Sequence, residues 1–118
     1  MALYRVEGLV LRSRELGEAD RLVTLWSRTE GKLRAVARGS RRPRSRLAAA
    51  TQPFCHGHYL LMRGRELDSL TQAEVAGHGL RPLREDLTRM TLASLTAELV
   101  DALTEERAPV EGLFEDLL

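Results

Sequence analysis

RLVTLWSRTEGKLRAVARGSRRPRSR, residues 21–46, combines two alternating runs, a short turn and a basic loop. The runs are Arg21–Arg28 and Lys32–Arg38, separated by Thr29-Glu30-Gly31. Alternation of apolar and polar residues indicates strands, and a three-residue loop that ends in glycine is typical of a hairpin. This stretch therefore predicts a β-hairpin that leads directly into an exposed arginine-rich segment.

The turn length predicts which residues face each other across the hairpin. With Thr29-Glu30-Gly31 as the turn, antiparallel pairing places Trp26 opposite Arg34. A two-residue turn would mix apolar and basic side chains on both faces, so we reject it. The apolar face then consists of Val23, Leu25, Leu33, Ala35 and Ala37, with Ser27 as its polar member. The basic face consists of Arg28, Lys32, Arg34 and Arg38 around Trp26.

The charges of the 118-residue chain are unevenly distributed, although the formal net charge is only +1. Residues 1–48 contain 12 Lys/Arg and 5 Asp/Glu, a net of +7, whereas residues 49–118 contain 6 and 12, a net of −6. The length suits a single domain with its own core. A basic first half has the sign expected for a nucleic-acid partner.

Cysteine usage and hydropathy point to a soluble cytoplasmic protein. Cys55 is the only cysteine, which excludes an intramolecular disulfide and fits a reducing compartment. Charged residues interrupt the apolar residues near the start, so no signal peptide is expected. No uncharged apolar run approaches the length of a membrane span.

The remaining segments predict a small barrel followed by helices. Further strands are expected at residues 3–15, 54–63 and 67–75, with a short helix at 46–52 capped by Ser45. Five short strands with a helix between the third and fourth match the OB-fold, a five-stranded barrel whose second and third strands bind nucleic acid. We thus expect a mainly β fold with C-terminal helices: an OB-fold domain at 1–79 and a helical segment at 80–118. The apolar period of that segment predicts one helix from about Leu83 to Glu105 and a second one from Pro109.

Metal and catalytic sites are not expected. Cys55, His56 and His58 lie close together, but a metal site needs three or four ligands, and His78 lies far along the chain. Neither a phosphate-binding glycine loop nor a nucleophile elbow appears in the sequence, so we expect a protein that is not an enzyme and has no cofactor. Trp26 remains open between base stacking and core packing. Because aromatic residues are few, phosphate contact by arginine should dominate binding.

Several segments resemble the bacterial DNA repair protein family RecO. The resemblance runs from about Val6 to Phe54 and rests on GEADR at 17–21, GKL at 31–33 and ARG at 37–39 followed by a basic loop. It continues more loosely through residues 60–74 and 81–87. RecO proteins continue into a larger helical lobe, so the chain is expected to correspond to the N-terminal OB-fold region and to end near the beginning of that lobe.

The resemblance implies a nucleoid-associated recombination mediator in DNA repair and homologous recombination. Such a protein binds single-stranded and duplex DNA, anneals complementary strands and, with a RecR partner, assists RecA loading. Recognition of single-strand binding protein and the family's zinc site are associated with the missing lobe. Transferred to this chain, the DNA-binding surface falls on Arg28, Lys32, Arg34, Arg38, Arg41, Arg42, Arg44 and Arg46, with Trp26 as a candidate for stacking. The alternative is a protein-interaction module whose arginine-rich loop docks an acidic partner.

Overall fold

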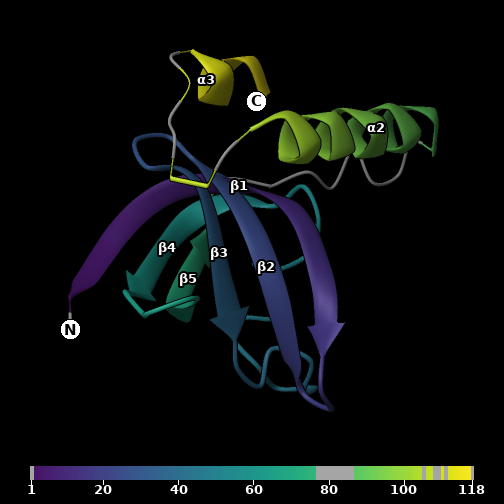
Figure 1. Cartoon of the computed structure of the whole chain (residues 1–118). Helices are drawn as coiled ribbons and strands as arrows, with labels where there is room; N and C mark the ends of the chain where they lie inside the picture. The colour runs from purple at the N-terminus through teal and green to yellow at the C-terminus, as the bar shows by residue number, and fades with distance from the viewer. Residues whose placement is uncertain (1, 77–86, 105, 108–109, 111, 118) are drawn as a thin grey trace.

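Five strands form a closed barrel in a computed structural model that describes residues 2–76, 87–104, 106–107, 110 and 112–117. The strands are β1 (Leu3–Leu16), β2 (Asp20–Ser27), β3 (Gly31–Ala37), β4 (His56–Met62) and β5 (Asp68–Val75). Their order around the barrel is β1-β2-β3-β5-β4, and only the β3–β5 pairing is parallel. This is the OB-fold arrangement, so the predicted fold class is confirmed (Figure 1).

The barrel interior is filled by the inward side chains of the strands. It is closed by apolar residues of the arginine-rich segment, the connection between β3 and β4 (residues 38–55). Val10, Val23, Leu25 and Leu33 are completely buried in it. Leu47 and Ala50 from the β3–β4 connection belong to the same cluster. The alternation that predicted the apolar hairpin face therefore predicted the inner wall of the barrel correctly.

A β-bulge in β1 reverses which residues of that strand point outward. The pairing with β2 shifts between Val10 and Arg12, so Leu11 is an extra residue on the β1 side. Before the bulge Leu9 faces outward, and beyond it the outward residues are Arg12 and Arg14. Bulges bend a strand and change the direction of its side chains, which suits the curvature of a small barrel.

The β2–β3 hairpin has the predicted faces but a different register. Trp26 pairs with Lys32 and Thr24 pairs with Arg34, so the predicted pairing of Trp26 with Arg34 is wrong. The cause is the turn, which spans residues 28–30, while Gly31 with φ 73° already pairs with Ser27. A shift of two residues keeps every side chain on its face, because the side-chain period of a strand is two.

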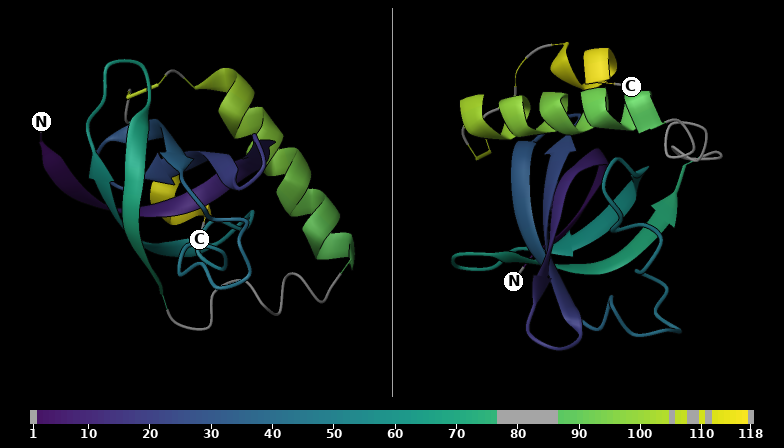
Figure 2. Two further views of the ribbon diagram at one scale, coloured as in Figure 1. Left: turned by 90° about the horizontal axis from the view of Figure 1, so that it is seen from below. Right: turned by 90° about the vertical axis from the view of Figure 1, so that its right-hand side faces the viewer.

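Two helices cover one end of the outer barrel surface, α2 (Leu87–Leu103) and α3 (Leu113–Leu117). Figures 1 and 2 show α2 lying across the barrel end that carries the β2–β3 turn, with α3 at the same end of the barrel. Ala97 and Phe114 are buried there in a second apolar cluster that also contains Leu9, Leu11, Trp26 and Phe54. The prediction that the helix also bears apolar residues on another side fits the exposed Leu95, Leu99 and Leu103.

The chain beyond α2 is joined to the barrel by a buried carboxylate. Asp68 is only 1% exposed and accepts a hydrogen bond from Tyr4. It also forms an ion pair with Arg107, whose Nη2 lies 2.6 Å from Asp68 Oδ2. Burial, followed by the bond to Asp68, raises the pKa of Tyr4 to about 12. The Arg107 amide donates to the Lys32 carbonyl at 2.7 Å, which places this segment along the edge of β3.

The arginine-rich segment differs from its prediction in one respect. Residues 46–52 form successive hydrogen-bonded turns rather than the predicted regular helix. Ser45 Oγ still accepts a hydrogen bond from the Leu47 amide, as a capping residue does. The Ala48 carbonyl accepts a bond from Arg21 of β2, which fixes these turns to the barrel.

Three earlier predictions involve residues outside the described ranges: the helix starts at 83 and 109, and the position of His78. Within the described part of the chain, no helix is long and apolar enough to cross a membrane.

Candidate nucleic-acid interface

The outer face of β1, β2 and β3 has a covered half and an open half. The covered half carries Trp26 and Lys32 beneath the helices. In the open half, Thr24 pairs with Arg12 on one side and Arg34 on the other, so three strands contribute to one row. Arg14 lies one outward position further along β1, opposite Leu22. The open half is therefore an arginine-rich sheet surface.

The predicted loop arginines divide into exposed and bonded side chains. Arg38, Arg42, Arg44 and Arg46 are exposed, and within the described residues none of them forms an ion pair. Arg41 instead binds Glu15 at 3.2 Å and donates to the Gly17 carbonyl at 2.8 Å. Arg41 thereby connects the loop to the β1–β2 turn. The exposed guanidinium groups present the paired donors that phosphate oxygens accept.

Trp26 lies in the core and is not accessible to a nucleic-acid base. Its side chain is 1% exposed and packs in the second apolar cluster with Leu9 and Phe114. The open choice between stacking and packing is thus decided in favour of packing. The alternation of β2 put Trp26 on the correct outer face, but the sequence did not show that helices cover that face.

Lys32 is also buried. Its ammonium group binds carbonyls at the C-terminal end of α2 and is therefore not available to a phosphate. Its side chain is 7% exposed, and Nζ donates to the Asp101 carbonyl and the Thr104 carbonyl, both at 2.7 Å. Nζ also lies 3.2 Å from Asp101 Oδ1. Burial alone raises the pKa of Asp101, but the bonds from Lys32 and Arg12 outweigh burial and lower it.

Arg28 is exposed but is engaged by carboxylates and by α3. It donates to Glu7 Oε1 at 2.9 Å, pairs with Glu115, and lies 4.4 Å from the ring centre of Phe114. His56 Nε2 lies 2.7 Å from the other Glu7 oxygen. The bond from Arg28 lowers the pKa of Glu7 to about 2, against the effect of burial and with help from His56. Arg28 therefore mainly connects α3 to the barrel.

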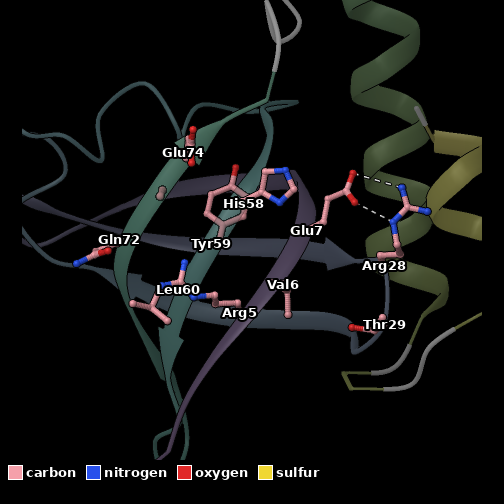
Figure 3. A pocket seen from close by; sticks show the side chains of 11 residues that line it. Arg5, Val6, Glu7, Arg28, Thr29, His58, Tyr59, Leu60, Gln72 and Glu74 are labelled. Atoms are coloured by element: carbon pink, nitrogen blue, oxygen red, sulfur yellow. Dashed lines mark hydrogen bonds and ion pairs between the residues drawn. The ribbon is translucent and has the colours of Figure 1, made fainter.

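A separate groove lies over β1, β4 and β5, on the other side of Arg28 (Figure 3). Figure 3 shows Arg28 turned toward Glu7 at one end of this groove, whereas Arg5 projects near its middle. Acidic Glu7 and Glu74 line it together with the basic residues. Its mixed charge makes it a poorer match for a polyanion than the open half of the β1–β2–β3 face.

Cys55, His56 and His58 were the residues considered as metal ligands, and no metal site was expected there. Cys55 is buried, His56 is engaged by Glu7, and His58 projects into the groove of Figure 3. Among the described residues, no three His, Cys, Asp or Glu side chains are grouped so as to hold a metal ion.

Arg12 and Arg14 belong to the open half, but the sequence reasoning missed them. Strict alternation along β1 would put both on the same face as Val6 and Val10, which point into the barrel. The bulge at Leu11 brings them outward instead. The only signal in the sequence was the pattern Arg12-Ser13-Arg14, in which both arginines share one face of the strand. The bulge is needed to show that this face is the outer one.

Comparisons with known proteins agree with this architecture. The family described as "Recombination protein O N terminal" matches residues 1–78, and "Recombination protein O C terminal" matches residues 84–118. A "DNA repair protein RecO" from Symbiobacterium thermophilum is 52% identical over 118 residues, covering 100% of this chain and 46% of the relative. The protein of the same name from Bacillus subtilis is 43% identical over 116 residues, covering 98% of this chain and 45% of the relative. The chain thus spans about half the length of these curated relatives. With a family match over most of its length and such identities, the chain belongs to the RecO family.

Proposed function

We propose that the chain is a non-catalytic DNA-binding module of a recombination mediator in DNA repair. The observation that carries the proposal is the group of Arg12, Arg14 and Arg34 on the outer face of the OB-fold barrel, together with the exposed arginines of the segment after β3, which are Arg38, Arg42, Arg44 and Arg46. OB-folds bind nucleic acids on the face of their second and third strands, and Arg34 lies on that face beside Arg12 and Arg14 of β1. Membership in the RecO family and relatives named DNA repair proteins support the same role.

The finer activities follow from the family and belong to the proposal. The module binds single-stranded and duplex DNA at the nucleoid, takes part in annealing complementary strands, and assists RecA loading together with RecR. Arginine contacts to phosphate carry no sequence information, so binding is weakly sequence-specific. Because Trp26 is buried, stacking on it contributes nothing to affinity.

A salt titration of the chain against a fluorescent single-stranded oligonucleotide, with duplex alongside, tests the proposal. Neutralising about five phosphates gives a slope of log affinity on log salt of roughly −3.5 for single strands. Trp26 emission should stay constant on binding, since its side chain is covered. No binding at low salt would refute DNA binding by this chain.

A matched pair of variants distinguishes DNA binding from the alternative, an arginine loop that docks an acidic protein. Arg41 already binds the Glu15 carboxylate, which shows that this loop accommodates acidic side chains. Reversing Arg38 and Arg44 to Glu should weaken DNA binding and make the salt slope shallower by about 1.4. Arg5→Glu with Arg65→Glu is the control, because it changes the charge equally at the groove of Figure 3 and at the exposed β4–β5 connection. Equal DNA binding by both variants would favour the acidic partner.

A further inference from the structure

A small hollow lies within the open half, between its arginines and the C-terminal part of α2. It has a volume of about 60 Å³ and is lined by Arg12, Arg14, Leu22, Thr24, Arg34 and Asp101. Three of these six residues are arginines, and Asp101 is the one carboxylate among them. This volume is several times smaller than that of a small-molecule pocket. Its small size and its arginine lining suit a single anionic group such as a phosphate.

The strand register explains why three arginines line this one hollow. Arg12 and Arg34 flank Thr24 on neighbouring strands, so their backbones are roughly 10 Å apart, two strand spacings. Arginine side chains are long enough to meet above the short, 6% exposed Thr24 side chain between them. Arg14 approaches from the next outward position of β1. Within the described residues, neither Arg14 nor Arg34 forms an ion pair.

The carboxylate of Asp101 already supplies one negative charge at one side of the hollow. Its Oδ2 lies 3.3 Å from Arg12 Nη1, and its Oδ1 lies 3.2 Å from Lys32 Nζ. The carboxylate is 9% exposed and is held by a buried ammonium, so it stays in place when a ligand arrives. A phosphate entering the hollow therefore meets two unpaired arginines, a third one shared with Asp101, and the negative charge of Asp101.

We propose that this hollow is a seat for one DNA backbone phosphate, and that Asp101 of α2 limits its affinity. This inference rests on the proposed DNA binding and specifies it. Arg14 and Arg34 supply the main donors, and Arg12 divides its guanidinium between the phosphate and Asp101. The opposing carboxylate keeps the contact weak and readily reversible, because like charges a few ångströms apart repel.

Two pairs of charge-matched variants test the seat by DNA affinity. Arg14→Gln with Arg34→Gln should lower affinity for an oligothymidylate about tenfold. Arg5→Gln with Arg65→Gln, which removes the same charge from two exposed positions outside the open half, should change it less than about twofold. Asp101→Asn should raise affinity about threefold more than Glu98→Gln, which removes the same charge from an exposed position of α2. Asparagine keeps an oxygen that accepts from Lys32, and circular dichroism checks that each variant is folded.

Nuclear magnetic resonance of the unmodified chain gives a test that does not depend on folding of variants. The side-chain Nε–H signals of Arg12, Arg14 and Arg34 should shift on addition of oligothymidylate, while that of Arg5 should not. Inorganic phosphate should shift the same three signals only at millimolar concentrations. Saturation by micromolar phosphate would identify a free anion as the ligand and overturn the DNA assignment.

The two proposals fail in distinguishable ways. Oligonucleotide binding that leaves the three signals unchanged, or that keeps the parent's affinity in the Arg14→Gln, Arg34→Gln variant, would refute the seat while DNA binding by the loop stands. Equal effects of Asp101→Asn and Glu98→Gln would refute the limiting role of Asp101. Absence of any oligonucleotide binding would refute the proposed function itself.

Discussion

Lys32, the only lysine of the chain, closes the C-terminal end of α2. The last carbonyls of a helix lack partners within it and carry partial negative charge, so a nearby cation stabilises them. From the outer face of β3, the ammonium of Lys32 reaches the carbonyl of Asp101 in the last turn of α2 and that of Thr104 directly after the helix. One buried side chain thereby connects β3 to the end of the helix.

Replacing Lys32 by Met preserves the side-chain length but removes these bonds. We expect Lys32→Met to lower the free energy of unfolding by roughly 3 kcal/mol, because two carbonyls lose the Lys32 donor and the Asp101 carboxylate keeps only Arg12 as a charged partner. Urea denaturation measures this loss. Arg34→Met, on the same strand and face but exposed, should stay within about 0.5 kcal/mol of the parent. Similar losses in both variants would contradict a special role for Lys32.

At the level of single residues, the sequence predicted faces better than partners. Alternation assigned Trp26, Lys32 and Arg34 to one face correctly, because a two-residue register error leaves faces unchanged. It gave no information on which of the three are covered, since covering depends on a helix more than sixty residues away along the chain. Arg34 consequently remains a candidate for contact with DNA, whereas Trp26 and Lys32 do not.

Among the elements, β1 shows why two arginines of the proposed surface could not be predicted. Its outward arginines, Arg12 and Arg14, follow a bulge that no residue preference announces. The apolar residues of β1 do not reveal which residues face the barrel interior. Leu9 and Leu11 are also buried, but beneath the helices. Strand number and order were predictable from alternation and turns, but the local reversal of β1 required the paired strand.

The short helix α3 is connected to the barrel through Glu7, whose charge makes this connection pH-dependent. Arg28 contacts Glu7 as well as Phe114 and Glu115 of α3, and His56 contacts Glu7 and Phe114. The pKa of Glu7 is about 2 in the folded protein, below its ordinary value of 4.5. A lowered pKa means that the stabilisation is complete above pH 4.5 and is lost as the pH falls toward about 2.

Glu7→Gln should accordingly cost about 1 kcal/mol of stability at neutral pH, as expected for a partly exposed ion pair. The difference between parent and variant should shrink as the pH falls from 4.5 toward about 2, because the parent then loses its own charge. Chemical denaturation across this range measures the difference. Glu66→Gln, on the exposed β4–β5 connection, should stay within about 0.5 kcal/mol of the parent throughout. A constant Glu7→Gln difference would show that the charge of Glu7 is not the cause.

At the scale of the whole molecule, the barrel and the helices share one apolar cluster. The sequence predicted a boundary near residue 79 from the change in hydrophobic period, and that boundary remains a prediction about domains. Trp26 from the barrel and Phe114 from α3 are both almost fully buried in the shared cluster. The change in hydrophobic period does not separate two independently packed parts. Separating the barrel from the helices would expose these aromatic side chains to water.

Barrel and helices should therefore unfold in a single cooperative transition. Trp26 emission reports on the shared cluster and far-ultraviolet circular dichroism reports on α2, so their urea transitions should coincide. Phe114→Ala should shift both curves together by roughly 3 kcal/mol, since it leaves a cavity beside Trp26. Leu103→Ala, with an 80% exposed side chain, should shift neither. Loss of the helical signal at lower urea, with Trp26 emission unchanged, would instead show that the helices dissociate from an independently stable barrel.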